Sequence, residues 1–246
     1  MPTIIHKGVL LALSLVSASA CASHWSYDGE GSPEHWGNLD DAWKTCLSGK
    51  NQSPINIDST LNAHLTPLET HYTDGPTTLI NNGHTIQAGE AKSTRDTIVL
   101  DGKTWTLQQF HFHAPSENTI HGKTYAMEMH LVHSNAEGEL VVVAVMFDQG
   151  AKNEALEELW RKMPAQAGQS ATLATALDLN RLLPDNKTYW RFSGSLTTPP
   201  CSEGVTWIVL KHPLTLSADQ LEKFSHTLHH ANNRPVQSLH GRIVVE

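Results

Sequence analysis

Near the middle of the chain the sequence reads Leu107-Gln108-Gln109-Phe110-His111-Phe112-His113. Polar and apolar side chains alternate here, which is typical of a β-strand, because successive side chains of a strand point to opposite faces of the sheet. One face would hold Gln109, His111 and His113, and the other Phe110 and Phe112. The aromatic face needs a core to pack against. The stretch therefore predicts a sheet with two imidazoles side by side above an aromatic core.

Short runs rich in alternating or β-branched residues recur on both sides of this stretch. They cover residues 78–87, 96–100, 104–113, 125–133, 139–147 and 205–210. The pair Asp101-Gly102 lies between two of these runs and suits a tight hairpin turn, because glycine adopts a positive φ without steric cost. The sequence predicts a mainly β (α+β) fold with a central, twisted, mostly antiparallel sheet.

Two segments have helical periodicity. Residues 153–163 place apolar side chains along one helical face, and residues 218–230 follow Ser217, which has capping-box spacing to Gln220. We expect both to be short helices at the periphery of the sheet. No repeat, charge run or long linker divides the chain beyond its first residues, so we expect one catalytic domain over residues 23–246.

The N-terminal segment has the pattern of an export signal. Lys7 precedes an apolar run at residues 9–16 and small residues up to Ala22. We expect residues 1–22 to be a signal peptide and the protein to be periplasmic or secreted. An alternative is a lipid-modified N-terminus at Cys21. The apolar run is far shorter than the roughly 20 residues that cross a bilayer, and no later run is longer, so we expect no membrane span.

The net charge of −8 gives no excess of basic side chains for a phosphate backbone, so nucleic acid is not an expected partner. The chain has 16 histidines. The simplest interpretation of most of them, including His71, His121, His229 and His230, is a solvated surface residue.

The chain has three cysteines, and Cys21 falls in the export segment. In an oxidising compartment the remaining two, Cys46 and Cys201, can pair, and we predict a disulfide between them. The alternative, two buried free thiols, fits a cytosolic protein better.

A third histidine changes the interpretation of the His111 and His113 pair. His130 lies 130 − 113 = 17 residues beyond His113, which leaves room for an antiparallel strand to return beside the first. Three imidazoles that converge would form a zinc site with one open corner, the arrangement of catalytic zinc. Gln109 and Glu128 each precede a histidine by two residues, so each shares its face. We expect Gln109 to orient His111 and Glu128 to orient His130 by hydrogen bonds.

Seven short blocks of sequence are spread over nearly all of the chain beyond the export segment. They are residues 109–113, Glu128-Met129-His130-Leu131-Val132-His133, Gly194-Ser195-Leu196-Thr197-Thr198-Pro199-Pro200, Ser32-Pro33-Glu34-His35-Trp36-Gly37, Gln52-Ser53-Pro54-Ile55-Asn56-Ile57, Asn81-Asn82-Gly83-His84 and Asn233-Arg234-Pro235. In their order along the chain these blocks resemble the α-class carbonic anhydrases. The pair Cys46 and Cys201 is similar to the disulfide of the secreted bacterial members, which ties the N-terminal region to the threonine loop.

The resemblance implies a zinc enzyme that hydrates carbon dioxide reversibly to bicarbonate and a proton, by attack of zinc-bound hydroxide. It implies Thr197 as the residue that orients the nucleophile and Glu117 as the acceptor of the Thr197 hydroxyl. It also implies His84 as the proton shuttle. The family's substrate pocket maps onto Val132, Val142, Leu196, Thr198 and Trp207.

Two other functions compete with this interpretation. A binding-only domain could keep the fold, although such relatives tend to lose a metal ligand. A cupin-like oxygenase or isomerase would use the spacing of His111, His113 and Glu117, with the glutamate as a metal ligand, and would favour iron or manganese over zinc. The sequence leaves open whether the protein forms a homodimer, and whether the glycan acceptor patterns at Asn51 and Asn186 are used.

Overall fold

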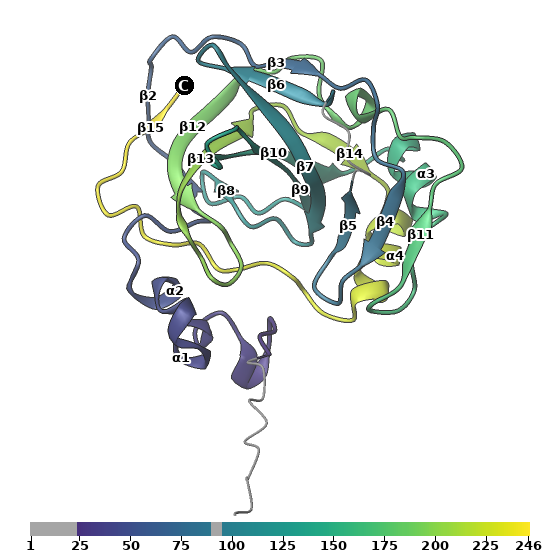
Figure 1. Ribbon diagram of the computed structural model, residues 1–246, viewed down its shortest axis with the longest axis horizontal. Helices are drawn as coiled ribbons and strands as arrows, with labels where there is room; N and C mark the ends of the chain where they lie inside the picture. The colour runs from purple at the N-terminus through teal and green to yellow at the C-terminus, as the bar shows by residue number, and fades with distance from the viewer. Residues whose placement is uncertain (1–23, 90–94) are drawn as a thin grey trace, which may run out of the picture.

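The computed structural model describes residues 24–89 and 95–246, so the predicted signal peptide and Cys21 lie outside the described residues. Three long neighbouring strands form the centre of a twisted sheet (Figure 1): β7 (Lys103–His113), β9 (Met127–Ser134) and β10 (Leu140–Gln149). β9 pairs antiparallel with both β7 and β10. These strands match the predicted runs to within two residues at each end.

The sheet contains 13 strands within the described part of the chain, in the order β11-β4-β5-β7-β9-β10-β13-β12-β15-β2, and β3, β6 and β14 pair off this path. Most pairs are antiparallel, but β13 and β14 run parallel to β10, and β15 runs parallel to β2. A separate parallel pair consists of β1 and β8. The remaining strands are β1 (Asn56–Ile57), β2 (Thr60–Leu61), β3 (Glu69–His71), β4 (Thr78–Asn81), β5 (Ile86–Gly89), β6 (Thr97–Leu100), β8 (Thr119–Ile120), β11 (Ser170–Thr172), β12 (Tyr189–Ser195), β13 (Glu203–Leu210), β14 (Leu214–Leu216) and β15 (Val244–Val245). The predicted fold class is confirmed.

Two turns show where the strand predictions succeed and fail. Asp101 (φ 52°) and Gly102 (φ 73°) form the predicted tight turn between β6 and β7. The run at 78–87, expected as one strand, is instead an antiparallel hairpin of β4 and β5. Its turn is closed by Asn82, whose side-chain oxygen accepts the backbone N–H groups of His84 and Thr85. Asparagine favours such local hydrogen bonds over a continuous strand.

Both predicted helices are present but end earlier than expected. α3 (Glu154–Trp160) begins after Asn153, whose side chain accepts two backbone N–H groups, and it stops ahead of Pro164, because a residue before proline avoids helical backbone angles. α4 (Ala218–Leu228) begins with the predicted capping box and ends where His229 adopts φ 64°.

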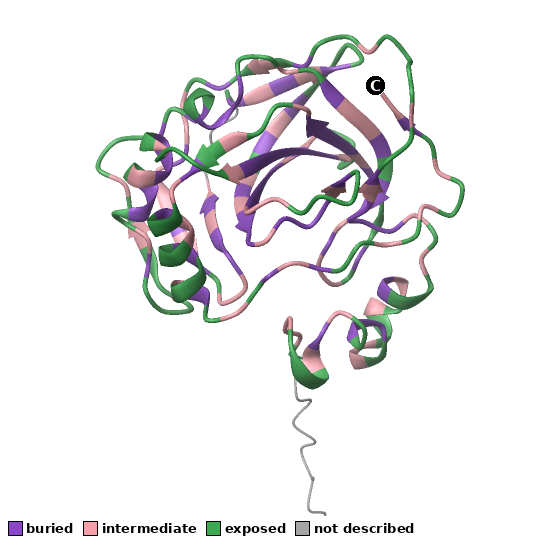
Figure 2. Cartoon of the chain, turned by 180° about the vertical axis from the view of Figure 1, so that it is seen from behind, coloured by how far each residue is buried: buried purple, intermediate pink, exposed green. Residues whose placement is uncertain are grey.

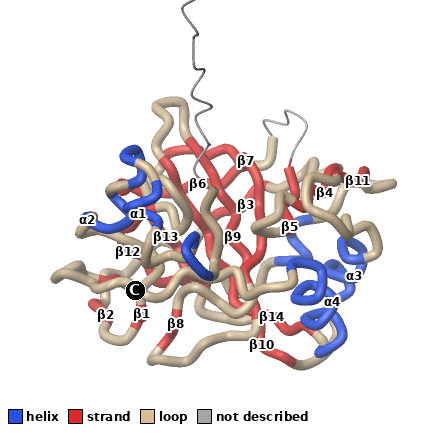
Figure 3. The backbone as a smooth tube through the Cα atoms, turned by 90° about the horizontal axis from the view of Figure 1, so that it is seen from below, coloured by secondary structure: helices blue, strands red, loops and turns tan. Residues whose placement is uncertain are grey.

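Figure 3 shows α3 and α4 at one end of the sheet and the N-terminal helices at the other. The other helical elements are α1 (Trp36–Leu39), α2 (Thr45–Ser48) and the 3-10 turns Gly29–Gly31, Asp41–Trp43 and Leu179–Leu182. Every helix within residues 24–89 and 95–246 is too short or too polar to span a bilayer.

The central strands are buried on both faces, as Figure 2 shows for the strands coloured purple. On one face Phe110 and Phe112 pack in the larger core cluster, together with Trp160 of α3 and Phe224 of α4. The opposite face has a smaller apolar cluster that includes Val142 and Trp207. The histidines of β7 project on this second face, so the sheet separates the main core from the candidate site.

The predicted disulfide between Cys46 and Cys201 is present. Both cysteines are buried beside Trp36, with Trp25 and Tyr27 packed against them. The bond ties the helical N-terminal region to the segment that follows β12.

We expect a Cys46→Ser, Cys201→Ser double variant to lose up to about 5 kcal/mol of unfolding free energy, because the bond closes a loop of 155 residues and so restricts the unfolded chain. Urea unfolding of the double variant and the oxidised parent protein measures this difference. Equal unfolding free energies would contradict the expectation.

Candidate metal centre

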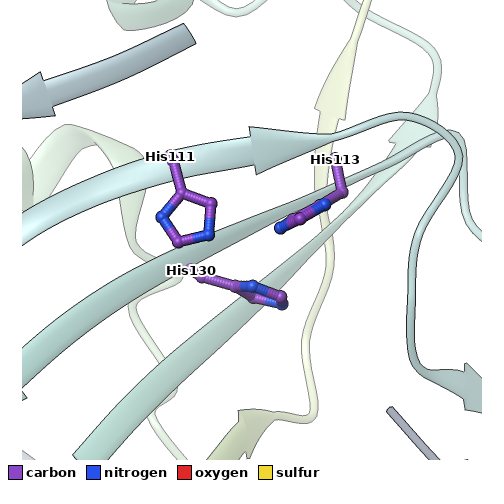
Figure 4. Close-up of side chains that lie close together, drawn as sticks. All are labelled: His111, His113 and His130. Atoms are coloured by element: carbon purple, nitrogen blue, oxygen red, sulfur yellow. The ribbon is translucent and has the colours of Figure 1, made fainter. Parts of the chain in front are cut away.

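The three predicted metal-binding histidines converge. In the antiparallel register of β7 and β9, His111 lies directly opposite His130, and His113 lies opposite Glu128. The ring centroids are 4.6–5.3 Å apart, and one nitrogen of each ring lies within 4.8 Å of the other two. Figure 4 shows the three rings turned toward a common point. This is the only group of three potential metal ligands among the described residues.

In each ring, the nitrogen that is turned away from the other two histidines, called the outer nitrogen, lies within hydrogen-bond distance of an oxygen. His111 Nδ1 lies 2.8 Å from Gln109 Oε1, and His130 Nε2 lies 2.9 Å from Glu128 Oε1, which places both predicted orienting residues where the sequence put them. His113 Nδ1 lies 2.6 Å from the carbonyl oxygen of Asn232. No sequence pattern marks Asn232 for this role, because every residue type has a backbone carbonyl.

These contacts fix the protonation state of the inner nitrogens, which are the ring nitrogens that face the other two histidines. A carbonyl or carboxylate oxygen can only accept, so the outer nitrogen of each ring has the proton and the inner nitrogen presents a lone pair. Burial, and for His111 the nearby His113 and His130, lowers the pKa of all three rings, which favours this neutral form. His113 Nε2 is buried with no hydrogen-bond partner. Three lone pairs that face one another in a buried site repel unless a cation lies between them, so the residues fit a bound metal.

Glu117 is not one of the converging ligands. One of its carboxylate oxygens accepts the backbone N–H of Arg234, and its own backbone N–H donates to Glu128. Burial raises the pKa of Glu117 well above its usual value. The Thr197 side chain nearby lowers this pKa to a smaller degree, and Glu117 Oε2 is buried with no hydrogen-bond partner among the described residues. The cupin-like alternative, which needs Glu117 as a ligand, is therefore wrong.

The predicted substrate-pocket residues lie on the same face of the sheet as the histidines. Val142 is the cross-strand neighbour of both Val132 and Trp207. The Trp207 ring meets the His130 ring edge to face, with centroids 4.8 Å apart. Leu196 packs against the same apolar cluster, and Thr198 follows in the loop after β12.

His84 lies in the hairpin turn between β4 and β5 and is half-buried. Its ring stacks on Trp25, with centroids 3.7 Å apart and planes within 9°. Partial burial lowers the pKa of His84, with smaller effects from His24 and His230. Asn232 Nδ2 donates to the carbonyl of His84, so a single residue holds the backbone of His84 and the ring of His113.

His133, three residues beyond His130, faces the other side of the sheet, as strand alternation predicts. It is fully buried, with one ring nitrogen 2.8 Å from the Tyr72 hydroxyl. Burial lowers its pKa from 6.5 to about 4. As the pH falls below 6.5 the unfolded chain takes up this proton first, so stability falls between pH 6.5 and about pH 4, by about 3 kcal/mol in total.

We therefore expect the His133→Gln variant, which keeps a hydrogen-bonding group for Tyr72, to have an unfolding free energy that depends less on pH across this window. Urea unfolding at several pH values compares the slopes of the parent protein and the variant. Identical slopes would show that His133 contributes no pH dependence.

The fold and the three converging strand histidines are those of a class of enzymes in which such a group would hold a metal ion. The family described as eukaryotic-type carbonic anhydrase matches residues 31–246. The chain is 68% identical to a carbonic anhydrase of Klebsiella pneumoniae over 246 residues, which is all of both chains. A structure of the α-carbonic anhydrase of Thermovibrio ammonificans aligns with a TM-score of 0.88 at 48% identity and covers 91% of this chain and 99% of its own. A structure of the α-carbonic anhydrase of Photobacterium profundum aligns with a TM-score of 0.85 at 49% identity. That alignment covers 91% of this chain and 100% of the other. The chain belongs to the α-class carbonic anhydrase family.

Proposed function

We propose that this protein is a zinc-dependent carbonic anhydrase that interconverts carbon dioxide with bicarbonate and a proton. The observation that supports this most directly is the set of three imidazole lone pairs that converge from β7 and β9 without a fourth ligand among the described residues. Membership of the family, whose general reaction is carbon dioxide hydration, supports the choice of substrate.

Neutral imidazoles without a carboxylate favour zinc over iron or manganese. Cys46 and Cys201 are joined in the disulfide, so neither can supply a thiolate that would close the site. When bound, zinc supplies a nucleophile by ionising water near neutral pH, a property for which carbonic anhydrase is itself the usual example. Gln109, Glu128 and the Asn232 carbonyl hold the rings, so the ligands need little reorganisation.

Thr197 and Glu117 would set the direction of attack. The Glu117 carboxylate is buried. One of its oxygens accepts the backbone N–H of Arg234, and the Glu117 backbone N–H donates to Glu128, so two hydrogen bonds fix its position. If Thr197 donates its hydroxyl proton to Glu117, the Thr197 oxygen can only accept from the attacking oxygen. That constraint would aim a lone pair of the nucleophile at the substrate.

Carbon dioxide is uncharged and needs few hydrogen bonds, so an apolar wall beside the metal suits it. Val132, Val142, Leu196 and Trp207 supply such a wall on the histidine face of the sheet. Thr198 would place a hydroxyl at the edge of this wall.

Each hydration releases a proton, and His84 is our candidate to move it to solvent. We expect His84→Ala to lower turnover in weak buffer by up to about a hundredfold, because a positioned acid–base group is lost. Added imidazole should restore part of the rate. Stopped-flow assays at several buffer concentrations measure this, with the exposed His71→Ala as the control. Unchanged turnover of His84→Ala in weak buffer would refute the shuttle.

The disulfide supports a location outside the reducing cytoplasm. We accordingly propose that residues 1–22 direct export to the periplasm or the medium and that residues 23–246 form one catalytic domain.

Metal analysis paired with stopped-flow carbon dioxide hydration on the same purified sample tests the proposed activity. We expect one zinc per chain and rapid hydration that chelation abolishes. A zinc-loaded protein without hydration activity would favour the binding-only alternative.

A further inference from the structure

A second group of histidines lies at the end of α4, outside the catalytic site. His226 is in the last turn of this helix, and His229 follows at its C-terminal end. Both side chains are exposed, and their ring centroids are 5.6 Å apart with planes at 58°. That separation is close to the 5.0 and 5.3 Å between His111 and its two partners. Within the described residues, neither ring has a hydrogen bond or an ion pair.

The backbone of His229 ends the helix at this pair. An ideal helix would continue past Leu228, but His229 adopts φ 64° and its N–H donates to the carbonyl of Ser225. This left-handed position is normally taken by glycine or asparagine, because a side chain there costs free energy. His226 lies three residues earlier, so the two imidazoles are neighbours at the end of the helix.

The surroundings favour a cation. The C-terminal end of an 11-residue helix has a partial negative charge from its last carbonyls. Glu222 is also exposed and lies one turn before His226, at the spacing that places i and i+4 residues on one helix face. Lys223, three residues before His226, is the nearest positive charge in sequence and would repel a bound cation. His230 is not part of the pair, because its ring stacks on Tyr27 and its Nδ1 contacts the Ala231 carbonyl.

The geometry points to a surface site for a divalent transition metal, held by the imidazoles of His226 and His229, with the Glu222 carboxylate as a negative charge one helical turn away. Water would complete the coordination. Imidazole ligands with coordination positions left for water suit Ni²⁺, Cu²⁺ and Zn²⁺. The site is separate from the catalytic histidines: the inner face of α4 packs through Phe224 against Phe112 of β7, and His226 and His229 are exposed. It does not depend on the proposed activity.

The test uses the full zinc-loaded protein and Ni²⁺ as the probe. Calorimetric titration should show binding of one Ni²⁺ beyond the resident zinc, which metal analysis after the titration should find retained. His226→Ala and His229→Gly should each weaken Ni²⁺ binding at least about tenfold, since the loss of even an outer partner of a metal ligand costs about 10- to 100-fold in affinity. Glycine suits the left-handed position, so His229→Gly removes the imidazole without backbone strain. His71→Ala is the matched control and should bind Ni²⁺ as the parent protein does.

Ni²⁺ affinity that is unchanged in His226→Ala or in His229→Gly would overturn the site. So would loss of Ni²⁺ binding in His84→Ala, because that result would place the metal between His24 and His84, whose rings are 5.9 Å apart. Thermal unfolding of each variant without Ni²⁺ checks that the fold is intact. With Ni²⁺, the melting temperature should rise for the parent protein and not for His226→Ala.

Discussion

His111→Ala is expected to abolish both zinc binding and carbon dioxide hydration. His111 supplies one of three lone pairs, and the antiparallel register places it directly opposite His130, so no nearby described side chain can take its position. Two imidazoles would remain, which leaves two open corners and a much weaker site. We expect the variant to lose its zinc on dialysis against a mild chelator and to keep less than about 1% of the parent activity, because the nucleophile depends on the metal.

Metal analysis and stopped-flow hydration on the same dialysed samples measure both effects. His71→Ala is the control, because it removes an exposed imidazole from β3, outside the group of converging ligands. Circular dichroism shows whether His111→Ala is folded, which the main core on the opposite face of the sheet should ensure. A folded His111→Ala protein that keeps one zinc per chain would refute the proposed metal centre.

Thr197→Ala is expected to keep zinc and to lose about a hundredfold in hydration rate. Thr197 is not among the converging ligands, so metal affinity should not change. Its hydroxyl is the group that would orient the nucleophile against Glu117, and misplacement of a reacting atom by about 1 Å can cost about a hundredfold in rate. Thr197→Ser keeps the hydroxyl and should recover most of the activity.

The loop that contains Thr197 is fixed by its neighbours, so the substitution should act locally. The Ser195 hydroxyl accepts the backbone N–H of Ser53, and the Ser195 carbonyl accepts the indole N–H of Trp207. The Leu196 N–H donates to the carbonyl of Ser202. A zinc-loaded Thr197→Ala protein that hydrates carbon dioxide at the parent rate would show that Thr197 does not direct the attack.

Sequence alone was sufficient to predict the central strands and the three histidines that converge. Alternation with a period of two assigns His111 and His113 to one face and Phe110 and Phe112 to the other, whatever the rest of the fold. The same rule couples Gln109 to His111 and Glu128 to His130. It also directs His133 away from the three converging histidines, and the structure places His133 beside Tyr72 in the main core. Local rules likewise predicted the Asp101-Gly102 turn and the capping box of α4.

Other features of the fold and the site were not predicted from the sequence. Asn232 orients His113 through its backbone carbonyl, which no residue pattern reveals. The hairpin at residues 78–87 depends on hydrogen bonds of Asn82 to the backbone, which compete with strand alternation. His229 was interpreted as an ordinary surface residue, because its left-handed backbone and its approach to His226 appear only once α4 has ended. Periodicity assigns each side chain to a face of its own element, whereas contacts between elements depend on how the whole chain packs, and so only the tertiary structure decided them.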